Sequence, residues 1–112
     1  MALRPDVLRH KRDFDRLYSK GRSSGERYIV VFYISNGLGY SRKAFLASKK
    51  VGDAVTRNRA RRLMKESFRK LEQSVRPGSD ILFIARQTIT DTKQAEVETS
   101  MRKALKKSGL LS

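Results

Sequence analysis

The sequence of 112 residues contains no cysteine and no tryptophan, only two prolines, and a single histidine, His10. Without cysteine the chain can form neither disulfides nor thiolate metal sites. No stretch approaches the roughly 20 consecutive apolar residues that a membrane-spanning helix requires. The first residues also lack the continuous apolar segment of a signal peptide. We therefore expect a cytoplasmic protein.

Acidic residues are also scarce, because 11 Asp and Glu stand against 26 Lys and Arg and give a net charge of +15 at pH 7. Such a charge repels itself until a polyanion neutralises it. Nucleic acid is the first candidate, ahead of an acidic membrane surface and an acidic protein. The length and the 38% hydrophobic content predict one domain, residues 1–112, with a modest core. Residues 1–5 are expected to be loosely ordered.

The few carboxylates do not gather where a metal or an acid–base pair could use them. Asp13 and Asp15 are two positions apart on an expected helix, so they diverge, and each is expected to balance a neighbouring arginine. Asp53 and Asp80 lie in or beside connections. A nuclease acting alone needs clustered carboxylates for metals or a histidine pair. The sequence therefore predicts no catalytic residue and no metal site in the polypeptide.

Hydrophobic periodicity predicts the order helix, hairpin, helix, strand, helix, which is an α+β sandwich of a small sheet against helices. Asn36-Gly37 is a strong turn signal between two strand-like runs, residues 22–26 read as a polar connection, and Thr56 is the expected N-cap of the central helix. The expected elements are a helix from about residue 6 to residue 20, strands at 27–35 and 40–50, a helix at 55–71, a strand at 80–87, and a helix from about residue 92 to Gly109.

The central helix carries two opposed faces. Small and apolar residues recur at steps of three and four and predict a core-facing stripe of Ala60, Leu63, Met64, Ser67, Phe68 and Leu71. Asn58, Arg62, Lys65 and Arg69 fall on the opposite side, with Arg59 and Arg61 on the flanks.

Like charges that face each other along a helix, and cations near its amino end, both lower helix stability. An ordinary solvated face therefore explains this arrangement less well than a phosphate-binding surface for RNA or DNA. Arginine outnumbers lysine in the segment, which favours bidentate contact with a structured polyanion. Asn58 fits recognition of a base edge or a 2′-hydroxyl. A local backbone hydrogen bond near the helix start is its alternative role.

With these residues in view, "SKKVGDAVTRNRARRLMKESFR" (residues 48–69) resembles the signature of the bacterial ribonuclease P protein family. "RDFDRLYSKGRS" resembles that family's first helix and "DILFIAR" its later strand, so that the resemblance spans about residues 9–108. The family implies an αβββαβα sandwich, like the second domain of a small-subunit ribosomal protein. It also implies a third strand in the first group and a left-handed crossover through the basic helix, against the general rule.

The resemblance further implies an endoribonuclease whose catalytic RNA, with Mg²⁺, removes the 5′ leader of precursor tRNA while the protein binds that RNA and the leader. The protein itself would bind no cofactor, and neither DNA nor a membrane would be a partner. The residues implied for contact with the catalytic RNA are Lys49, Lys50, Arg57, Asn58, Arg59, Arg61, Arg62, Lys65 and Arg69.

The implied leader-binding residues are Phe14, Tyr18, Phe32, Leu46 and Lys50. Aromatics beside cations suit single-stranded RNA, because bases stack on them with little sequence preference. Core packing is the alternative role of Phe14 and Tyr18. Leu46 stands where the family usually has a hydroxyl side chain.

Three other functions remain open at this point. A ribosomal or other structured-RNA protein would fit the same general fold. A DNA-binding protein is weakened by the lack of a compact helix-turn-helix pattern. A membrane-surface protein is weakened because the basic helix has a core-like apolar face and no interfacial tryptophan.

Overall fold

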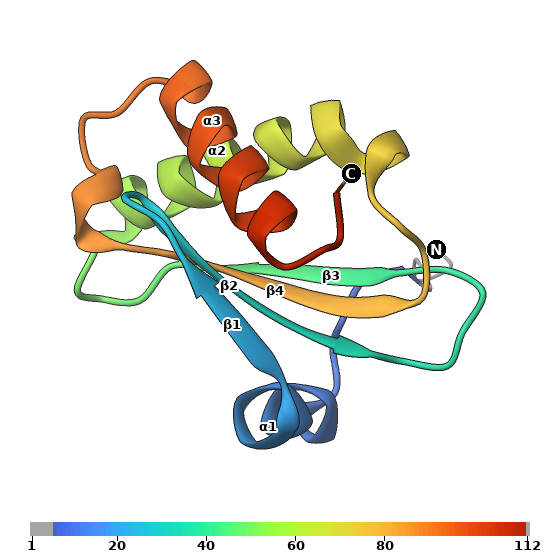
Figure 1. Ribbon diagram of the computed structural model, residues 1–112. Helices are drawn as coiled ribbons and strands as arrows, with labels where there is room; N and C mark the ends of the chain where they lie inside the picture. Colours follow the sequence, from blue (N-terminus) through green and yellow to red (C-terminus); the bar gives the residue numbers. More distant parts are fainter. Residues whose placement is uncertain (1–5, 112) are drawn as a thin grey trace, which may run out of the picture.

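The computed structural model describes residues 6–111 and has three layers (Figure 1), in which two helices cover one face of a four-stranded sheet and a third helix lies against the other. This confirms the expected αβββαβα sandwich; the expectation for residues 1–5 lies outside the described residues. The elements are α1 (Lys11–Lys20), β1 (Arg22–Gly25), β2 (Ile29–Ser35), β3 (Arg42–Leu46), α2 (Ala54–Leu71), β4 (Ser79–Ala85) and α3 (Gln94–Lys107), with short 3₁₀ helices at Glu72–Ser74 and Gln87–Ile89.

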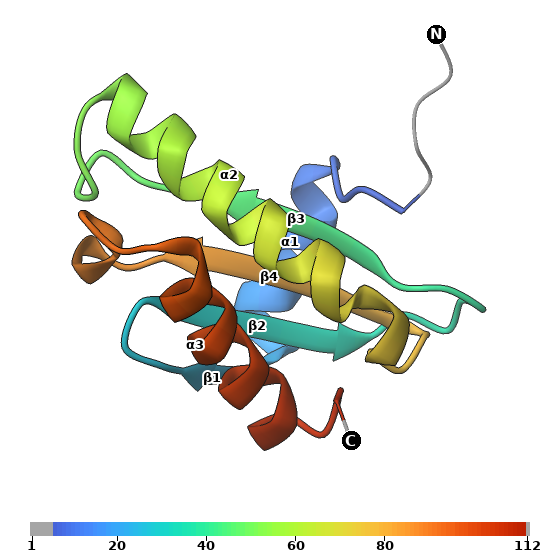
Figure 2. The ribbon, with the colours of Figure 1, turned by 90° about the horizontal axis from the view of Figure 1, so that it is seen from above.

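The strands lie in the order β1-β2-β4-β3, with β4 antiparallel to β2 and parallel to β3. The connection from β3 through α2 to β4 is left-handed, as Figure 2 shows, in agreement with the family resemblance. The expected hairpin between residues 27–35 and 40–50 is wrong, because β4 lies between those two strands. Three successive residues of β4, Ile81 to Phe83, are fully buried, and a strand buried on both faces belongs in the centre of a sheet.

The turn signal itself is correct, although it does not close a hairpin. Gly37 has a φ of +71°, which glycine adopts readily, and the side-chain oxygen of Asn36 accepts a hydrogen bond of 2.8 Å from the backbone N–H of Leu38. The amide group of Asn36 also donates to the carbonyl oxygen of Tyr40 at 3.1 Å. These hydrogen bonds of Asn36 order the loop between β2 and β3, which carries the chain past the end of β4.

Two further expectations failed because long-range pairing prevailed over local pattern. The first helix begins at Lys11 rather than near residue 6, since residues 6–8 pair with the outer edge of β3. The N–H of Lys43 donates to the carbonyl of Asp6, and the N–H of Leu8 donates to the carbonyl of Lys43, both at 2.9 Å. The polar residues 22–25 form β1, an edge strand that pairs with β2 through its backbone. Serine and glycine give an edge strand too little apolar alternation to be recognised.

The sheet separates two apolar cores. On the side of α2 and α3, the ring of Phe83 lies 5.2 Å from that of Phe45 and 5.1 Å from that of Phe68. On the other side, Leu17 of α1 is fully buried against the smaller core that includes Leu82. The large core anchors α2, so the outer side of α2 is held in a fixed orientation. The small core sets the position of α1.

Candidate nucleic-acid interface

Helix α2 has the two faces that its sequence predicts. Ala60, Met64, Ser67, Phe68 and Leu71 are buried and Leu63 is half-buried. Burial of such an apolar stripe, at about 25 cal/mol per Å² of apolar surface, fixes the helix against the sheet. The opposite side is exposed along its whole length and forms what we call the basic ridge, made of Asn58, Arg62, Lys65 and Arg69.

The start of α2 is set by Asp53 and not by Thr56. The carboxylate of Asp53 accepts a hydrogen bond of 2.9 Å from the backbone N–H of Thr56, which makes Asp53 the N-cap. This hydrogen bond lowers the pKa of Asp53 below its usual value, because it stabilises the charged form. The cap also places a negative charge at the helix end that the following arginines would otherwise destabilise.

Two cations of the basic ridge are uncompensated. Within residues 6–111, the side chains of Arg62 and Lys65 have no hydrogen-bond or ion-pair partner. Arg69 pairs with Glu66 one turn earlier, and this exposed pair contributes little to stability. The ridge therefore presents free positive charge on a rigid support.

Asn58 makes a side-chain contact rather than the local backbone bond considered as its alternative role. Its side-chain oxygen accepts a hydrogen bond from the guanidinium of Arg61. Its NH₂ group has no partner among the residues described and faces solvent with the exposed side chain. A donor is thus available at the amino-terminal end of the ridge.

The other cations implied for RNA contact lie off the ridge. The guanidinium of Arg59 donates to the carbonyl oxygen of Thr92 and so bridges α2 to the segment before α3. The Nε of Arg57 lies 3.5 Å from the carbonyl oxygen of Asp53 and is turned back toward the helix start. Lys49 and Lys50 are exposed in the turn that joins β3 to α2. The structure therefore brings together the four ridge residues, with Arg61 beside them, and holds Arg59 apart.

The face of the sheet that carries α1 presents aromatic rings. Tyr18 of α1 is 50% exposed, and its ring meets that of Phe32 of β2 edge to face at a centroid distance of 5.3 Å. Phe14 is half-buried and packs against the smaller core. The packing alternative thus applies to Phe14, whereas Tyr18 is open to a ligand. We call Phe14, Tyr18 and Phe32 the aromatic face.

The register of the strands places Leu46 on the same side of the sheet. Val30 pairs with Ile84, and Ile84 pairs with Leu46, so that these three side chains form one row across the sheet. Val30 and Ile84 are half-buried and Leu46 is 37% exposed. This row continues the aromatic face toward the turn that holds Lys50.

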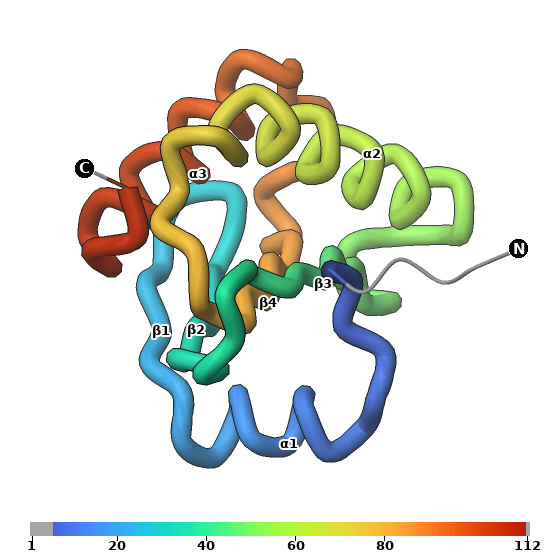
Figure 3. Tube along the Cα trace, turned by 90° about the vertical axis from the view of Figure 1, so that its right-hand side faces the viewer, coloured from blue at the N-terminus to red at the C-terminus, as the bar shows by residue number. Residues whose placement is uncertain are grey.

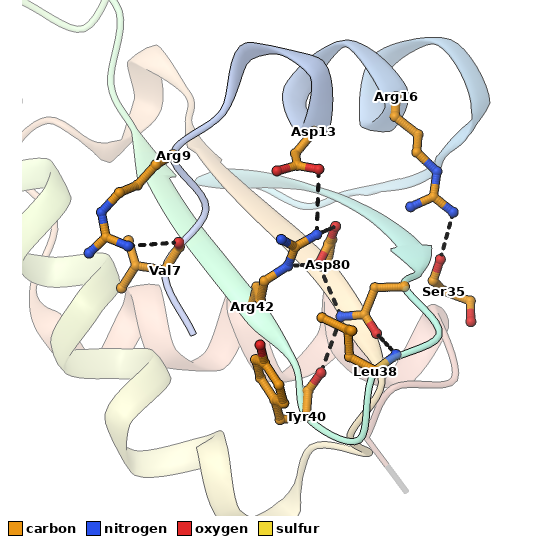
Figure 4. Close-up of polar contacts among 10 residues, drawn as sticks. Val7, Arg9, Asp13, Arg16, Ser35, Leu38, Tyr40, Arg42 and Asp80 are labelled. Atoms are coloured by element: carbon orange, nitrogen blue, oxygen red, sulfur yellow. Dashed lines mark hydrogen bonds and ion pairs between the residues drawn. The ribbon is translucent and has the colours of Figure 1, made fainter. Parts of the chain in front are cut away.

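A buried ion pair that the sequence did not reveal joins α1 to the sheet (Figure 4). The guanidinium of Arg42 donates to both carboxylate oxygens of Asp80, at 2.8 and 2.7 Å, and lies 3.5 Å from the carboxylate of Asp13 on α1. Asn36 donates to the same Asp80 carboxylate at 3.0 Å. The hydrogen bonds that Arg42 donates to the Asp80 carboxylate raise the pKa of Arg42. Arg16 also ties α1 to β2 through the carbonyl of Ser35 at 3.0 Å.

These contacts correct the partners expected for the first carboxylates. Asp13 pairs with Arg42 rather than with an arginine of its own helix, and Asp15 pairs with Lys11 at 2.7 Å. Asp80 is the second residue of β4, beside the connection as expected, and is 1% exposed. Among residues 6–111, no three His, Asp or Glu side chains converge to hold a metal ion. In the same part of the chain, no helix combines the length and apolar character needed to cross a membrane.

A left-handed β3–α2–β4 crossover that displays a helix with an exposed cationic side defines a class of small basic α+β proteins. The family model named Ribonuclease P matches residues 3–109, and the chain belongs to this family, the protein component of a ribonucleoprotein that processes tRNA. This membership decides against the ribosomal, DNA-binding and membrane-surface alternatives.

Individual relatives agree with the family assignment. The chain is 41% identical over 98 residues to the ribonuclease P protein component of Thermoanaerobacter sp. (strain X514), which covers 88% of this chain and 84% of the relative. The Staphylococcus aureus RNase P protein superposes with a TM-score of 0.87 at 30% identity, covering 97% of this chain and 100% of that one. The Thermotoga maritima protein gives a TM-score of 0.77 at 30% identity, covering 85% and 90%.

Proposed function

We propose that this chain binds the catalytic RNA of ribonuclease P through the basic ridge, and the 5′ leader of precursor tRNA through the aromatic face. The complex of this chain with the catalytic RNA would then remove the leader endonucleolytically in the cytoplasm and so generate the mature 5′ end of the tRNA. The observation that carries the proposal is the pair of uncompensated cations, Arg62 and Lys65, on a helix whose other side is buried. A phosphate backbone on this ridge would release counterions and gain affinity from each contact.

The proposal divides the work between the RNA and the polypeptide. The described residues do not form a set of ligands that fits a metal ion. We assign the phosphodiester chemistry and its Mg²⁺ to the RNA because the family resemblance implies it. The residues of the polypeptide would bind the catalytic RNA and the leader and orient them. Lys49 and Lys50 would extend the ridge contact, while Arg57, Arg59 and Arg61 would support it from the flanks of α2.

Leader binding is supported by the shape of the α1 side of the sheet. Tyr18 and Phe32 offer an edge-to-face pair on which a base can stack, and the row of Val30, Ile84 and Leu46 offers further apolar area. Stacking of this kind contributes about 1–3 kcal/mol per base and tolerates any sequence. Lys50 lies in the turn after Leu46, where it can neutralise a leader phosphate. Precursors with different leaders would then bind through the same surface.

A reconstitution assay tests the function as a whole. The chain is expected to restore cleavage of precursor tRNA by a bacterial ribonuclease P RNA at low Mg²⁺, where the RNA alone cleaves slowly. The protein alone is expected to give no cleavage. Cleavage by the RNA-free chain that EDTA abolishes would contradict the assignment of the chemistry to the RNA.

The leader contact is tested with Tyr18→Ala, because Tyr18 is half exposed and its removal leaves the small core intact. The holoenzyme should bind leader-bearing precursor roughly 10-fold more weakly, the loss of about one stacked base. Its affinity for mature tRNA, which has no leader, should not change. Competitive binding assays with the two RNAs measure both affinities.

Tyr40→Ala is the matched control for this prediction, since Tyr40 is 43% exposed in the loop between β2 and β3, away from the aromatic face. It should leave both affinities unchanged. An equal loss for precursor and mature tRNA from Tyr18→Ala would rule out the leader contact.

A further inference from the structure

A groove lies along the outer edge of β3 and is lined by residues of the segment before α1, of α1, of β3 and of α2. Figure 3 shows the arrangement of these elements, with α2 above β3 and α1 below it. The volume of the groove is about 610 Å³, within the range of sites that bury small ligands. Its apolar walls come from four parts of the chain: the segment before α1, α1 itself, β3, and the last turns of α2. These wall residues are Val7, Leu8, Phe14, Ala44, Leu46 and Phe68.

The backbone of β3 leaves one hydrogen-bonding pair open in this groove. The N–H and the C=O of Lys43 point away from β4, because they pair with residues 6 and 8. Orientation alternates along a strand, so the N–H and C=O of Phe45 point to the same outer edge. Within residues 6–111, no group forms a hydrogen bond with the backbone N–H or C=O of Phe45. The groove thus offers one donor and one acceptor side by side on an apolar wall.

The charge at the mouth of the groove is supplied by the basic ridge. Lys65 and Arg69 line this groove, and they also line the concave surface along the ridge with Asn58 and Arg62. Deeper in, the ammonium of Lys43 is neutralised by Asp6 and by Glu72, the latter at 3.1 Å. A polyanion lying on the ridge therefore passes the mouth, while the interior is apolar and electrically balanced.

We propose that the groove binds one unpaired nucleotide of the catalytic RNA, whose base enters the groove while its phosphate stays at Lys65 and Arg69. The Watson–Crick edge of the base would pair with the N–H and C=O of Phe45, and its faces would contact Leu46 and Phe14. This inference rests on the proposed function, since it requires the same RNA to lie on the ridge. It adds a contact site that shares Lys65 and Arg69 with the ridge and borders the aromatic face at Phe14.

A nucleotide suits the groove better than an added peptide strand. Strand addition needs a continuous row of free backbone groups, but residues 6–8 already occupy those of Lys43. Within β3 only the single pair on Phe45 remains, which matches the donor and acceptor of one base edge. The two cations that the groove shares with the ridge, Lys65 and Arg69, also favour RNA, because its phosphates are negatively charged. Because they belong to the ridge, the nucleotide comes from the catalytic RNA and not from the leader.

Photocrosslinking of the assembled holoenzyme tests this proposal. p-Benzoylphenylalanine is introduced at Val7 in one variant and at the more exposed Leu46 in a second, in case the first does not fold. Each is assembled with catalytic RNA and either precursor or mature tRNA, then irradiated. We expect both positions to crosslink to the same unpaired nucleotide of the catalytic RNA, with either tRNA. The same amino acid at Lys103, exposed on α3, should not label it.

Removal of the base at the mapped nucleotide supplies the affinity readout. An abasic substitution there should weaken binding of the wild-type chain about 5- to 100-fold, the range for loss of one stacked base. The same substitution should have no effect at an unpaired nucleotide that does not crosslink.

Three outcomes would overturn the groove proposal while leaving the proposed function intact. These are a holoenzyme that cleaves precursor tRNA but shows no crosslink to the catalytic RNA, crosslinks confined to the leader or to base-paired nucleotides, and an abasic site without effect on affinity. Crosslinking to another protein instead of RNA would assign the groove to a peptide. A chain that binds no catalytic RNA and supports no cleavage would refute the proposed function itself, and the groove proposal with it.

Discussion

Replacing Arg62 and Lys65 together by alanine is expected to weaken binding of the catalytic RNA roughly 100-fold at about 0.1 M salt. Both side chains are exposed and have no partner within residues 6–111, so their removal costs no internal contact. Each phosphate contact contributes close to one power of the salt concentration to the binding constant, and at 0.1 M this is about a factor of ten. Filter binding or fluorescence titration across a salt series measures the effect.

The slope of the salt dependence separates this explanation from a loss of folding. The double variant should lower the slope of log K against log [salt] by about two, one for each lost contact. Lys103→Ala with Lys106→Ala removes the same charge from the exposed side of α3 and serves as the control. The control should change the affinity by less than about 3-fold, since it alters only the long-range field.

An unchanged slope in the Arg62 and Lys65 variant would exclude phosphate contacts by the ridge, even if affinity fell. Equal losses in the ridge variant and the α3 control would reduce the ridge to a share of the general charge of +15. Either result would remove the physical basis of the RNA-binding proposal.

The two faces of α2 could be predicted from the sequence because they depend only on helical spacing. Ala60, Met64 and Phe68 are buried as expected, and Asn58 and Arg62 are exposed on the other side. Even here the sequence predicts Thr56 as the N-cap where the structure has Asp53, because both residue types are good N-caps. In the structure the backbone N–H of Thr56 donates to the carboxylate of Asp53, which makes Asp53 the N-cap.

The order of the strands could not be predicted in this way, because it depends on contacts between distant segments. Residues 27–35 and 40–50 are joined by a good turn, and the apolar strand that separates them comes about 40 residues later. The handedness of the crossover came from the family resemblance alone, since the general rule favours the opposite hand.

The aromatic face shows the same limit at the level of single residues. Spacing on α1 could not separate Phe14, which packs into the small core, from Tyr18, which is half exposed. The ion pair of Arg42 and Asp80 was missed because it depends on the parallel register of β3 and β4, in which these residues are direct partners. A charged residue at the start of an otherwise apolar strand was the only local signal.

That ion pair leads to the second large effect, which concerns stability. Arg42→Ala is expected to destabilise the fold by about 3–5 kcal/mol, because it leaves a buried carboxylate without its cation. Asp80 is 1% exposed and Arg42 20% exposed, so water cannot replace the lost partner. For a domain of this size, the midpoint of thermal unfolding should fall by roughly 15 °C or more. Circular dichroism during heating measures it.

Lys11→Ala is the matched control, since it breaks an ion pair of similar length, with Asp15, whose side chains are 88% and 59% exposed. Its midpoint should stay within about 2 °C of the wild type, as expected for an exposed pair. Because removing the buried carboxylate together with its cation is far less costly, Arg42→Met with Asp80→Leu should recover much of the loss. A fall of less than 5 °C in Arg42→Ala would mean that the hydrogen bond from Asn36, together with solvent, is enough to satisfy the buried carboxylate of Asp80.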